Sequence, residues 1–410
     1  MDLDQAVAIE ATTIGWRVTY AIADVGAWVA PAGPLDAETH VRTQTYYAPD
    51  ERNPLHPPVL GESSASLLPD GPRPAVLWTI DVDAEGATTA IDVRRALVRS
   101  RAQLTYQQVQ DQLDDGDGTG APAVLHALPA IGEVLIAAAA ERGAIELGLP
   151  EQVVIRGDDG AWTLELRRDL PVERWNAQIS LLTGRAAATL MLGAGIGLLR
   201  TVPQADADSL PRLRRAARSL GIDWPDDHGP GAVLNGLDTS QPRNAAFADL
   251  AAELLRGAAY TPFQGTPPED PGHAGVGAPY AHVTAPLRRL VDRFGTEICL
   301  AVAAGDPVPE WVLEALDALP VEMAVGDSKG KKLDRAIIDA TEAFVLADRV
   351  GDVFAAHVVE TGDSYGTVVL DDPPVRGRCD TRHLPLGGDV HVRCTVADPV
   401  TRTVRFERVS

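Results

Sequence analysis

The first residues of the chain, DLDQAVAIE, place two carboxylates and an amide at short spacing. Asp2 and Asp4 are two residues apart in a segment that alternates like a strand, so both side chains are expected to face the same side. Carboxylate and amide oxygens suit a hard divalent cation, and Gln5 adds a neutral oxygen beside them. The alternative interpretation is that Asp2 and Asp4 are solvated charges near a chain end.

A second group that could carry chemistry is the arginine pair in APLRRLVDR. Pro286 is predicted to lie in the first turn of a helix, which would place Arg288 and Arg289 near a helix N-terminus that already favours anions. A phosphate fits this arrangement. An ordinary amphipathic helix, with Arg289, Asp292 and Arg293 paired along one face, is an alternative that is compatible with it.

Tyrosines and lysines form a third group of candidates. Tyr47 follows Tyr46 in a proline-rich loop, and Tyr106 stands at helical spacing from Leu113. Both Tyr47 and Tyr106 have the flat face that base stacking needs, but from the residues alone packing over the prolines or in the core is the favoured explanation. All the lysines lie in SKGKK (328–332), which is either a solvated face or a contact with an RNA backbone.

Several common site signatures are absent from the sequence. There is no G-x-S-x-G, P-loop or G-x-G-x-x-G fingerprint, so hydrolase-triad and nucleotide-fold interpretations lack support. The stretch DDGDGTGAPA (114–123) fails the spacing of a calcium loop and is predicted to be a solvated connection. Three scattered cysteines provide neither a disulfide framework nor a zinc site.

The 410 residues include 36 Lys and Arg against 58 Asp and Glu, a formal charge of −22, so a nucleic acid must bind through a local basic surface. The acidic N-terminus does not resemble a signal peptide. The longest apolar run, 186–199, is shorter than the about 20 residues that span a bilayer. We therefore expect a cytoplasmic protein that does not contact a membrane.

The N-terminal part of the chain is predicted to be mixed α/β. Residues 16–30 and 75–98 alternate like strands, and the proline-rich stretch between them is predicted to be an extended loop over the surface or a cleft. Helical spacing follows in 101–113 and 175–199. A loop at 261–279, rich in Pro and Gly, then leads into the helix with the arginine pair.

Five short strands follow a helical stretch that ends near residue 348. Their number and length suit a small OB-type barrel. We therefore divide the chain into a mixed α/β domain at 1–345 and an all-β barrel at 346–410.

Six segments, taken in order, resemble the RNB catalytic domain of the ribonuclease II and ribonuclease R family. They are DLDQAVAIE, AIADVGAWVAPAGPLDAET, TYYAPDERNPLHPPVLGESSASLLP, RALVRSRAQLTYQQV, PGHAG and YAHVTAPLRRLVD, and the resemblance covers about residues 1 to 340. It implies a mixed α/β fold around a narrow channel and a processive 3′-to-5′ exoribonuclease that releases nucleoside monophosphates from single-stranded RNA using Mg²⁺, with Mn²⁺ as a second option. The C-terminal strands resemble the family's RNA-binding OB barrel.

The resemblance also implies roles for individual residues. Asp2 and Asp4 match two members of the family's magnesium-binding aspartate cluster, which gives Gln5 a place in the metal site. Arg288 matches the arginine that supports the charged transition state. Tyr47 matches the aromatic that stacks on the 3′-terminal nucleotides, and Tyr106 the tyrosine that helps to fix the length of the final product. In the same motifs, Tyr280 and Arg289 are expected to contact RNA.

Two departures from the family pattern affect the expected activity. The family's cluster is I-D, a short spacer, then D-x-D-D, whereas Gln5 stands at the last position and the first aspartate would precede Met1. Ala285 also replaces the usual serine. Either the start codon is placed too far downstream, which we favour, or the chain has lost catalysis.

We expect a metal-dependent exoribonuclease that works as a monomer with no obligate protein partner. RNA capture would depend on the channel and the barrel. The alternatives are a catalytically impaired RNB-fold protein that binds RNA without cutting it, and a phosphodiesterase for small nucleotides.

Overall fold

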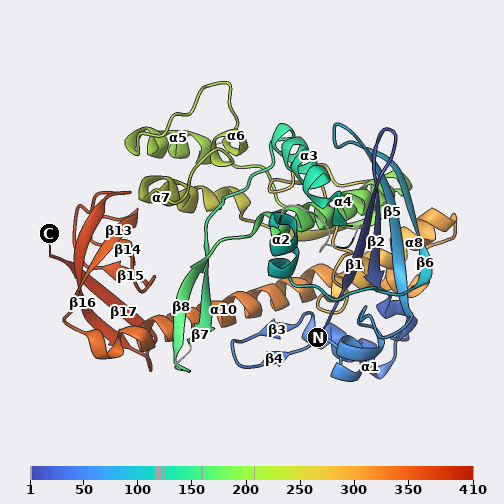
Figure 1. The fold of residues 1–410 in the computed structure, drawn as a ribbon, viewed down its shortest axis with the longest axis horizontal. Helices are drawn as coiled ribbons and strands as arrows, with labels where there is room; N and C mark the ends of the chain where they lie inside the picture. The colour runs from blue at the N-terminus through green and yellow to red at the C-terminus, as the bar shows by residue number, and fades with distance from the viewer. Residues whose placement is uncertain (1, 116–121, 123–124, 158–159, 207, 410) are drawn as a thin grey trace.

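The computed structural model describes residues 2–115, 122, 125–157, 160–206 and 208–409. A four-stranded antiparallel sheet, ordered β1-β2-β5-β6, lies at one end of the molecule (Figure 1). Its strands are β1 (Gln5–Ala11), β2 (Gly15–Ala23), β5 (Arg73–Asp83) and β6 (Thr88–Val98). Strand patterning in the first segment, in 16–30 and in 75–98 therefore predicted all four strands, although β1 begins only at Gln5 and β2 ends at Ala23.

The sheet shares one hydrophobic core with several helices, among them α4 (Pro171–Ala194) and α8 (Leu290–Ala304). Alternate side chains of β2 and β5 point to the same face, and Tyr20 and Trp78 of that set are fully buried together with Ile179 of α4. The small residues predicted in α4 allow close approach: a Cβ added at Gly184 would lie 2.1 Å from the ring of Tyr280. The core thus fixes the 280–289 segment against α4.

Smaller elements surround this core. Near the N-terminus lie α1 (Pro34–Arg42), the hairpin β3 (Tyr46–Tyr47) and β4 (Arg52–Asn53), and η2 (Leu60–Ser64). The middle of the chain forms α2 (Tyr106–Asp114), α3 (Leu128–Glu141), the hairpin β7 (Glu151–Arg156) and β8 (Trp162–Arg167), and the pair β9 (Ile196–Thr201) and β10 (Ala259–Gln264). Between β9 and β10 lie α5 (Ser209–Ser219), α6 (Pro230–Leu234) and α7 (Pro242–Ala251). The pair β11 (Gly272–His273) and β12 (Ala278–Pro279) precedes α8, and α9 (Glu310–Ala315) follows it.

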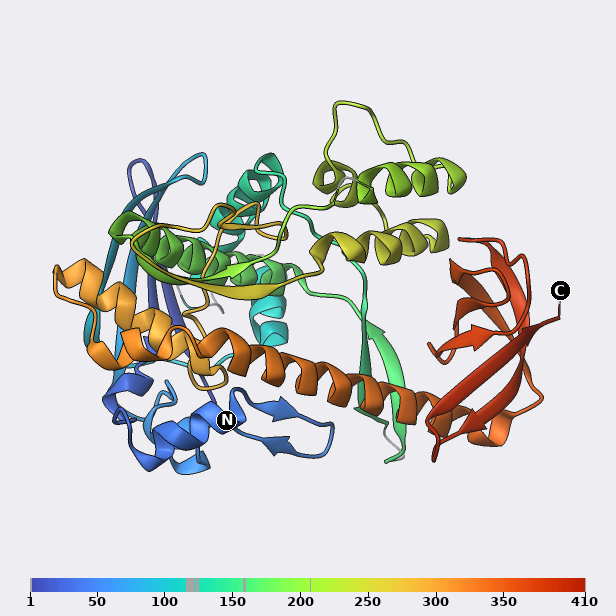
Figure 2. The same ribbon diagram turned by 180° about the vertical axis from the view of Figure 1, so that it is seen from behind.

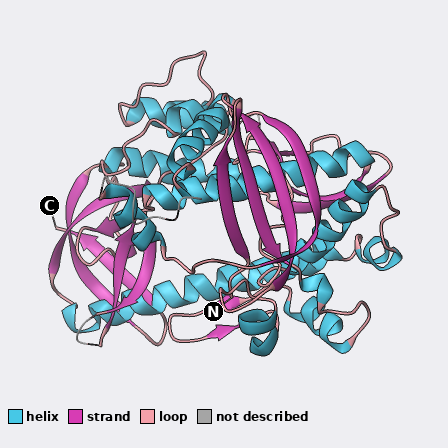
Figure 3. Ribbon diagram, turned by 45° about the vertical axis from the view of Figure 1, so that its right-hand side comes forward, coloured by secondary structure: helices cyan, strands magenta, loops and turns pink. Residues whose placement is uncertain are grey.

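The C-terminal part is a closed five-stranded barrel, as predicted. Its order is β13-β14-β15-β17-β16, and Phe406 and Val392 are fully buried inside it. The strands are β13 (Val353–Thr361), β14 (Gly366–Leu370), β15 (Arg376–Cys379), β16 (Asp389–Asp398) and β17 (Thr403–Arg408). The long helix α10 (Leu319–Leu346) runs from beside the sheet to this barrel (Figure 2). The sheet and the barrel therefore lie at opposite ends of the molecule (Figure 1), with helices between them (Figure 3).

Three sequence predictions need comment. The helix expected to start at Pro286 begins at Leu290, so Arg288 and Arg289 lie in the turn before it. Most of the stretch 114–123 lies outside the described residues, and the prediction of a solvated connection there stays a prediction. None of the described helices combines the length and apolar character needed to cross a membrane.

Candidate active site

Asp4 lies immediately before β1, and its backbone carbonyl accepts a hydrogen bond of 2.8 Å from the N–H of Ala23 on β2. Its side chain is buried. The backbone N–H of Leu287 donates to Oδ1 of Asp4 at 2.7 Å. Nε of Arg288 lies 3.7 Å from Oδ2 of the same carboxylate. Asp4 and Arg288, both predicted to belong to the site, are therefore adjacent in space.

The segment that carries Arg288 is held by Asp292 in the first turn of α8. Oδ1 of Asp292 accepts from the N–H of Ala285 at 2.6 Å, and both carboxylate oxygens accept from the guanidinium of Arg289 at 2.8 Å. Asp292 is fully buried, so Arg289 is committed to this ion pair. The helical pairing considered as the alternative for Arg289 is present. Arg288 remains half exposed and free to meet a ligand.

Burial raises the pKa of Asp4 to about 7, while the Leu287 N–H and the charge of Arg288 act in the opposite direction. In the protein without a bound cation, ionisation of this carboxylate is therefore unfavourable. A further positive charge beside Oδ2 would stabilise it.

Asp2 is held by the β3–β4 hairpin. The hydroxyl of Tyr47 donates to Oδ2 at 3.2 Å, and the guanidinium of Arg52 donates to Oδ1 at 3.0 Å. Tyr47 and Arg52 are directly opposite each other across the two strands, so one face of the hairpin contacts Asp2. Arg52 also pairs with Glu62 at 2.5 Å. Tyr47 is 46% exposed, which leaves its ring accessible for stacking.

Gln5 bridges the sheet and the loop that carries Arg288. Its Oε1 accepts from the hydroxyl of Tyr20 at 2.5 Å, and its Nε2 donates to the carbonyl of Thr284 at 2.7 Å. The hydroxyl of Tyr20 also contacts Ser180 of α4 at 2.9 Å. Only the second lone pair of Oε1 is left for a metal.

Tyr106 begins α2, where Thr105 and Gln108 form a reciprocal capping box. Its hydroxyl accepts a hydrogen bond of 3.0 Å from Asn176 of α4, and its ring is half exposed, not in the core. A cavity of about 470 Å³ is lined by Tyr106, Asn176 and Gln5 together with apolar side chains of the sheet. Tyr106 therefore faces an opening beside the first strand.

Tyr280, predicted to contact RNA, is only 6% exposed. Its ring packs edge-on against His282 and His273, with centroids 5.3 and 5.6 Å apart. A nucleotide base has no access to such a ring face, so Tyr280 supports the loop from inside the core.

Arg288 lies at the centre of the predicted residues. Burial raises the pKa of Tyr47 to about 12 and raises that of Tyr106, and in both cases the positive charge of Arg288 offsets part of the increase. Both tyrosines are thus within electrostatic range of Arg288 and stay neutral donors near pH 7. The structure brings together Asp2, Asp4 and Arg288 with the two accessible tyrosines.

The described residues contain no group of three or more His, Cys, Asp or Glu side chains that could hold a metal ion. The two carboxylates predicted to hold a metal are those of Asp2 and Asp4, and each also accepts hydrogen bonds from its neighbours. This set fits Mg²⁺, which usually keeps several waters and binds one or two carboxylates together with substrate phosphates.

Sequence reasoning missed the residues that hold the site. Four residues each orient a predicted site residue: Arg52, Asn176, Asp292 and Tyr20. Three of them contact partners that are distant in sequence. The contact of Asp292 with Arg289 was considered only as a pairing along a helix. Nothing in the sequence distinguishes them from surface or core residues of the same type.

The RNB domain profile matches residues 1–298, and the profile of the RNase II-type exonuclease C-terminal S1 domain matches residues 352–409. The chain belongs to the RNB family. Among curated relatives of this RNB chain, Ribonuclease R of Aquifex aeolicus is 25% identical over 453 residues, covering 100% of the chain and 62% of the relative. Ribonuclease R of Escherichia coli is 26% identical over 395 residues, covering 90% and 48%. The chain thus spans about half to three fifths of their length.

Solved structures show the same RNB fold. RNase R of Mycoplasma genitalium, in complex with ribose-methylated single-stranded RNA, matches with a TM-score of 0.88 at 18% identity, covering 100% of the RNB chain and 69% of its own. Yeast Ssd1, described as a pseudonuclease, matches with a TM-score of 0.73 at 17% identity, covering 95% and 49%. This fold occurs both in an RNase R and in a protein described as a pseudonuclease. The fold alone therefore does not decide whether the chain is catalytically active, and activity must be argued from the site.

Proposed function

We propose that this RNB protein is a Mg²⁺-dependent exoribonuclease that hydrolyses single-stranded RNA from the 3′ end to nucleoside monophosphates, with Mn²⁺ as an alternative ion. The observation that carries the proposal is the contact of Arg288 with Asp4 beside Asp2, Tyr47 and Tyr106. A nuclease needs these groups together: carboxylates for a metal, a cation for the phosphate and flat rings for the terminal bases. The family membership and the Ribonuclease R relatives support it.

Asp2 and Asp4 would hold the ion, which supplies charge stabilisation of the scissile phosphate and activation of water. Gln5 orients the strand through Tyr20 and Thr284 and offers one further lone pair. Arg288, half exposed beside Asp4, would contact two phosphate oxygens with its planar fork. Arg289, through Asp292, fixes the turn that presents it.

Tyr47 and Tyr106 are assigned to the 3′-terminal nucleotides, since both rings are half exposed. Tyr47 is oriented by Asp2 and Tyr106 by Asn176. We assign the barrel to RNA binding, and we propose that the protein acts as a monomer in the cytoplasm.

The test is a time course with a 5′-labelled single-stranded RNA in Mg²⁺, Mn²⁺ or chelator, analysed on a denaturing gel. We expect metal-dependent shortening from the 3′ end to a short limit product. An RNA that stays intact in all three conditions, yet shifts on a native gel, would instead support the alternative of a protein that binds RNA without cutting it. The specific observation in favour of that alternative is the Gln5 amide, which occupies a carboxylate position of the family pattern and already has partners at both ends.

A further inference from the structure

The lysines of this chain are concentrated in one turn of α10. Lys329, Lys331 and Lys332 are the only lysines in a protein with a formal charge of −22. The proposed active site uses none of them. Their concentration in an acidic protein indicates a separate local function.

Two glycines place this turn beside the active-site hairpin. A Cβ at Gly326 would lie 2.0 Å from Oγ1 of Thr43, and one at Gly330 would lie 2.7 Å from Nε2 of Gln44. Glycine is unfavourable within a helix, and here it lets α10 approach the chain just before β3. The ammonium group of Lys329 consequently lies 4.6 Å from the ring centre of Tyr46, next to Tyr47. The lysine turn therefore adjoins the proposed site.

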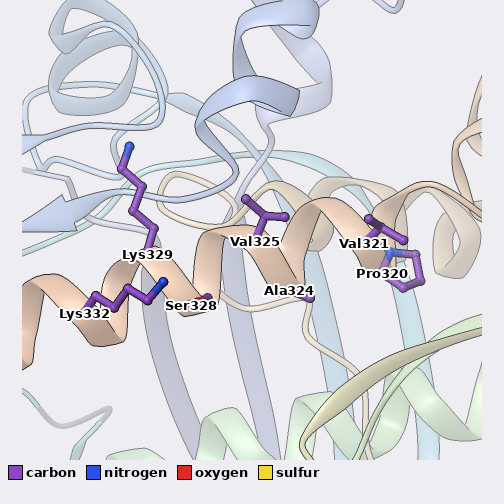
Figure 4. A pocket seen from close by; sticks show the side chains of 7 residues that line it. All are labelled: Pro320, Val321, Ala324, Val325, Ser328, Lys329 and Lys332. Carbon is purple, nitrogen blue, oxygen red and sulfur yellow. The ribbon is translucent and has the colours of Figure 1, made fainter.

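Two hollows lie along α10 at this turn. The first, of about 700 Å³, is lined by side chains of one face of the helix (Figure 4). These are Pro320, Val321, Ala324, Val325, Ser328, Lys329 and Lys332. Val321 and Val325 are 67% and 65% exposed, which is unusual for valines at adjacent turns of one helix.

The second hollow, of about 850 Å³, adds Lys331, Arg335 and, from the turn before β17 of the barrel, Arg402. Ser328 and Lys332 line both hollows, so the two form one continuous surface. This surface runs from the barrel to the hairpin that carries Tyr47.

The two carboxylates that line the second hollow are each paired with an arginine. Asp327 pairs with Arg200 at 3.0 Å, and Asp339 pairs with Arg335 at 2.8 Å. Among the described residues, no carboxylate lies within ion-pair distance of Lys331, Lys332 or Arg402. Three uncompensated cations beside exposed apolar side chains fit a partner with both phosphates and bases.

We propose that the α10 surface from Val321 to Arg335, extended by Arg402, binds the phosphate backbone of single-stranded RNA between the barrel and the Asp4–Arg288 site. Lys331, Lys332 and Arg402 contact phosphates, and the exposed valines contact bases or sugars. The inference rests on the proposed function for its choice of partner, and it adds the route that the strand follows.

The test uses the full chain, chelator to keep RNA intact, and a labelled oligoadenylate of about 16 nucleotides, long enough to reach a barrel. Affinity is measured by fluorescence anisotropy over a range of salt concentrations. Each phosphate contact in a single strand contributes about −0.7 to the slope of log affinity against log salt. The double variant Lys331→Gln/Lys332→Gln should therefore have a slope that is less steep by about 1.4. At about 0.1 M salt it should bind the RNA about 25-fold more weakly than the unmodified protein. Arg402→Gln alone should reduce the slope by about 0.7.

Two matched variants serve as controls. Lys331→Arg with Lys332→Arg keeps the charge and should bind like the unmodified protein. Arg215→Gln with Arg218→Gln removes two exposed charges from α5, which lies away from α10 in both views (Figures 1 and 2), and should leave the slope unchanged. Equal slopes for the Lys→Gln pair and the unmodified protein would overturn the inference.

The same variants separate this inference from the proposed function. If RNA is not cut in Mg²⁺ but the double Lys→Gln variant shows the less steep slope, RNA binding by the α10 surface is supported and the nuclease proposal is rejected. If RNA is cut while the Lys→Gln pair binds with the unmodified slope, the nuclease proposal stands and the α10 route falls. An oligonucleotide of about four nucleotides, too short to reach the barrel, should be cut at the same rate by both proteins.

Discussion

The backbone N–H of Leu287 donates a 2.7 Å hydrogen bond to Oδ1 of Asp4, which joins residues 283 positions apart. This bond leaves Oδ2 of Asp4 facing Arg288. Asp292 holds the same turn from the other side through the N–H of Ala285. The relative position of a proposed metal ligand and a proposed phosphate ligand therefore depends on one turn before α8.

Replacement of Asp4 tests the chemistry directly. Asp4→Asn keeps an oxygen that can accept from the Leu287 N–H but loses the charge that a metal requires. We expect the hydrolysis rate to fall by about 100-fold or more, with RNA affinity nearly unchanged. Gel time courses and anisotropy measure the two quantities. Asp92→Asn, at an exposed position on β6, is the control, and an unaffected rate in Asp4→Asn would remove this residue from the mechanism.

The raised pKa of Asp4 predicts a pH dependence of stability in chelator. Burial moves this pKa from 3.8 to about 7, so between these values the folded state keeps a proton that the unfolded chain loses. The contribution of Asp4 is therefore fully present below pH 3.8 and is lost as the pH rises towards 7. Between pH 3.8 and 7, the contribution of Asp4 to the free energy of unfolding falls by on the order of 4 kcal/mol. Asp4→Asn should be the more stable protein at pH 8, and this advantage should disappear near pH 4.

Buried histidines have the opposite effect on the pH dependence of stability. The Tm of the unmodified protein must therefore be compared with that of Asp4→Asn at each pH. Burial lowers the pKa of His56 to about 4 and lowers that of His282, and their contribution is lost as the pH falls below 6.5. Both histidines are present in both proteins and cancel in the difference of Tm. Mg²⁺ at pH 8 should raise the Tm of the unmodified protein but not that of Asp4→Asn. A Tm difference independent of pH would contradict the assignment.

Arg288 and Arg289 are adjacent in sequence, but we expect their substitution to have different effects on activity and stability. Arg288→Gln should slow hydrolysis about 100-fold while changing stability by less than about 0.5 kcal/mol, because its side chain is half exposed. Arg289→Gln should destabilise the fold by about 3–5 kcal/mol, because it leaves the fully buried Asp292 without its partner. Thermal unfolding and rates under saturating RNA distinguish the two effects. Equal loss of stability in both variants would show that Arg288 is also structural.

The sequence predicted the strands and the barrel because their periodicity is local. Phe406 and Val392 lie inside the barrel at positions where the strands alternate, and Trp78 lies in the sheet core for the same reason. The start of α8 was less predictable, since Pro286 permits a first helical turn but does not require one.

The site residues show the limit of that reasoning. Motif order assigned Asp4 and Arg288 to one site, and in the structure their side chains lie 3.7 Å apart, while their roles stay predictions. It did not predict that the ring of Tyr280 packs against Gly184, because that contact joins distant segments. The pairing of Arg289 with Asp292 is local and had been considered from the sequence as an alternative. Charge at a position can be inferred from sequence, whereas the partner that neutralises it is set by tertiary packing.

Tyr106 is expected to affect product length more than affinity. Tyr106→Phe keeps the ring and loses only the hydrogen bond to Asn176, so its limit product should match that of the unmodified protein. Tyr106→Ala removes the stacking surface, which is worth about 1–3 kcal/mol per base, and should release a longer limit product. Tyr365→Ala, at an exposed barrel tyrosine, should change binding without changing the length. An unchanged limit product in Tyr106→Ala would exclude Tyr106 from the 3′ end.

Gln5→Glu tests whether this position faces a metal. The new carboxylate can still accept from Tyr20, but its second oxygen would face the carbonyl of Thr284 in place of an N–H donor. In chelator we expect a loss of stability of about 1–3 kcal/mol from the broken bond and the unpaired oxygens. Mg²⁺ should restore most of the Tm and bind more tightly than to the unmodified protein, because a third carboxylate then joins Asp2 and Asp4. A Tm that stays low at every Mg²⁺ concentration would assign Gln5 only to the bridge between the sheet and the Arg288 turn.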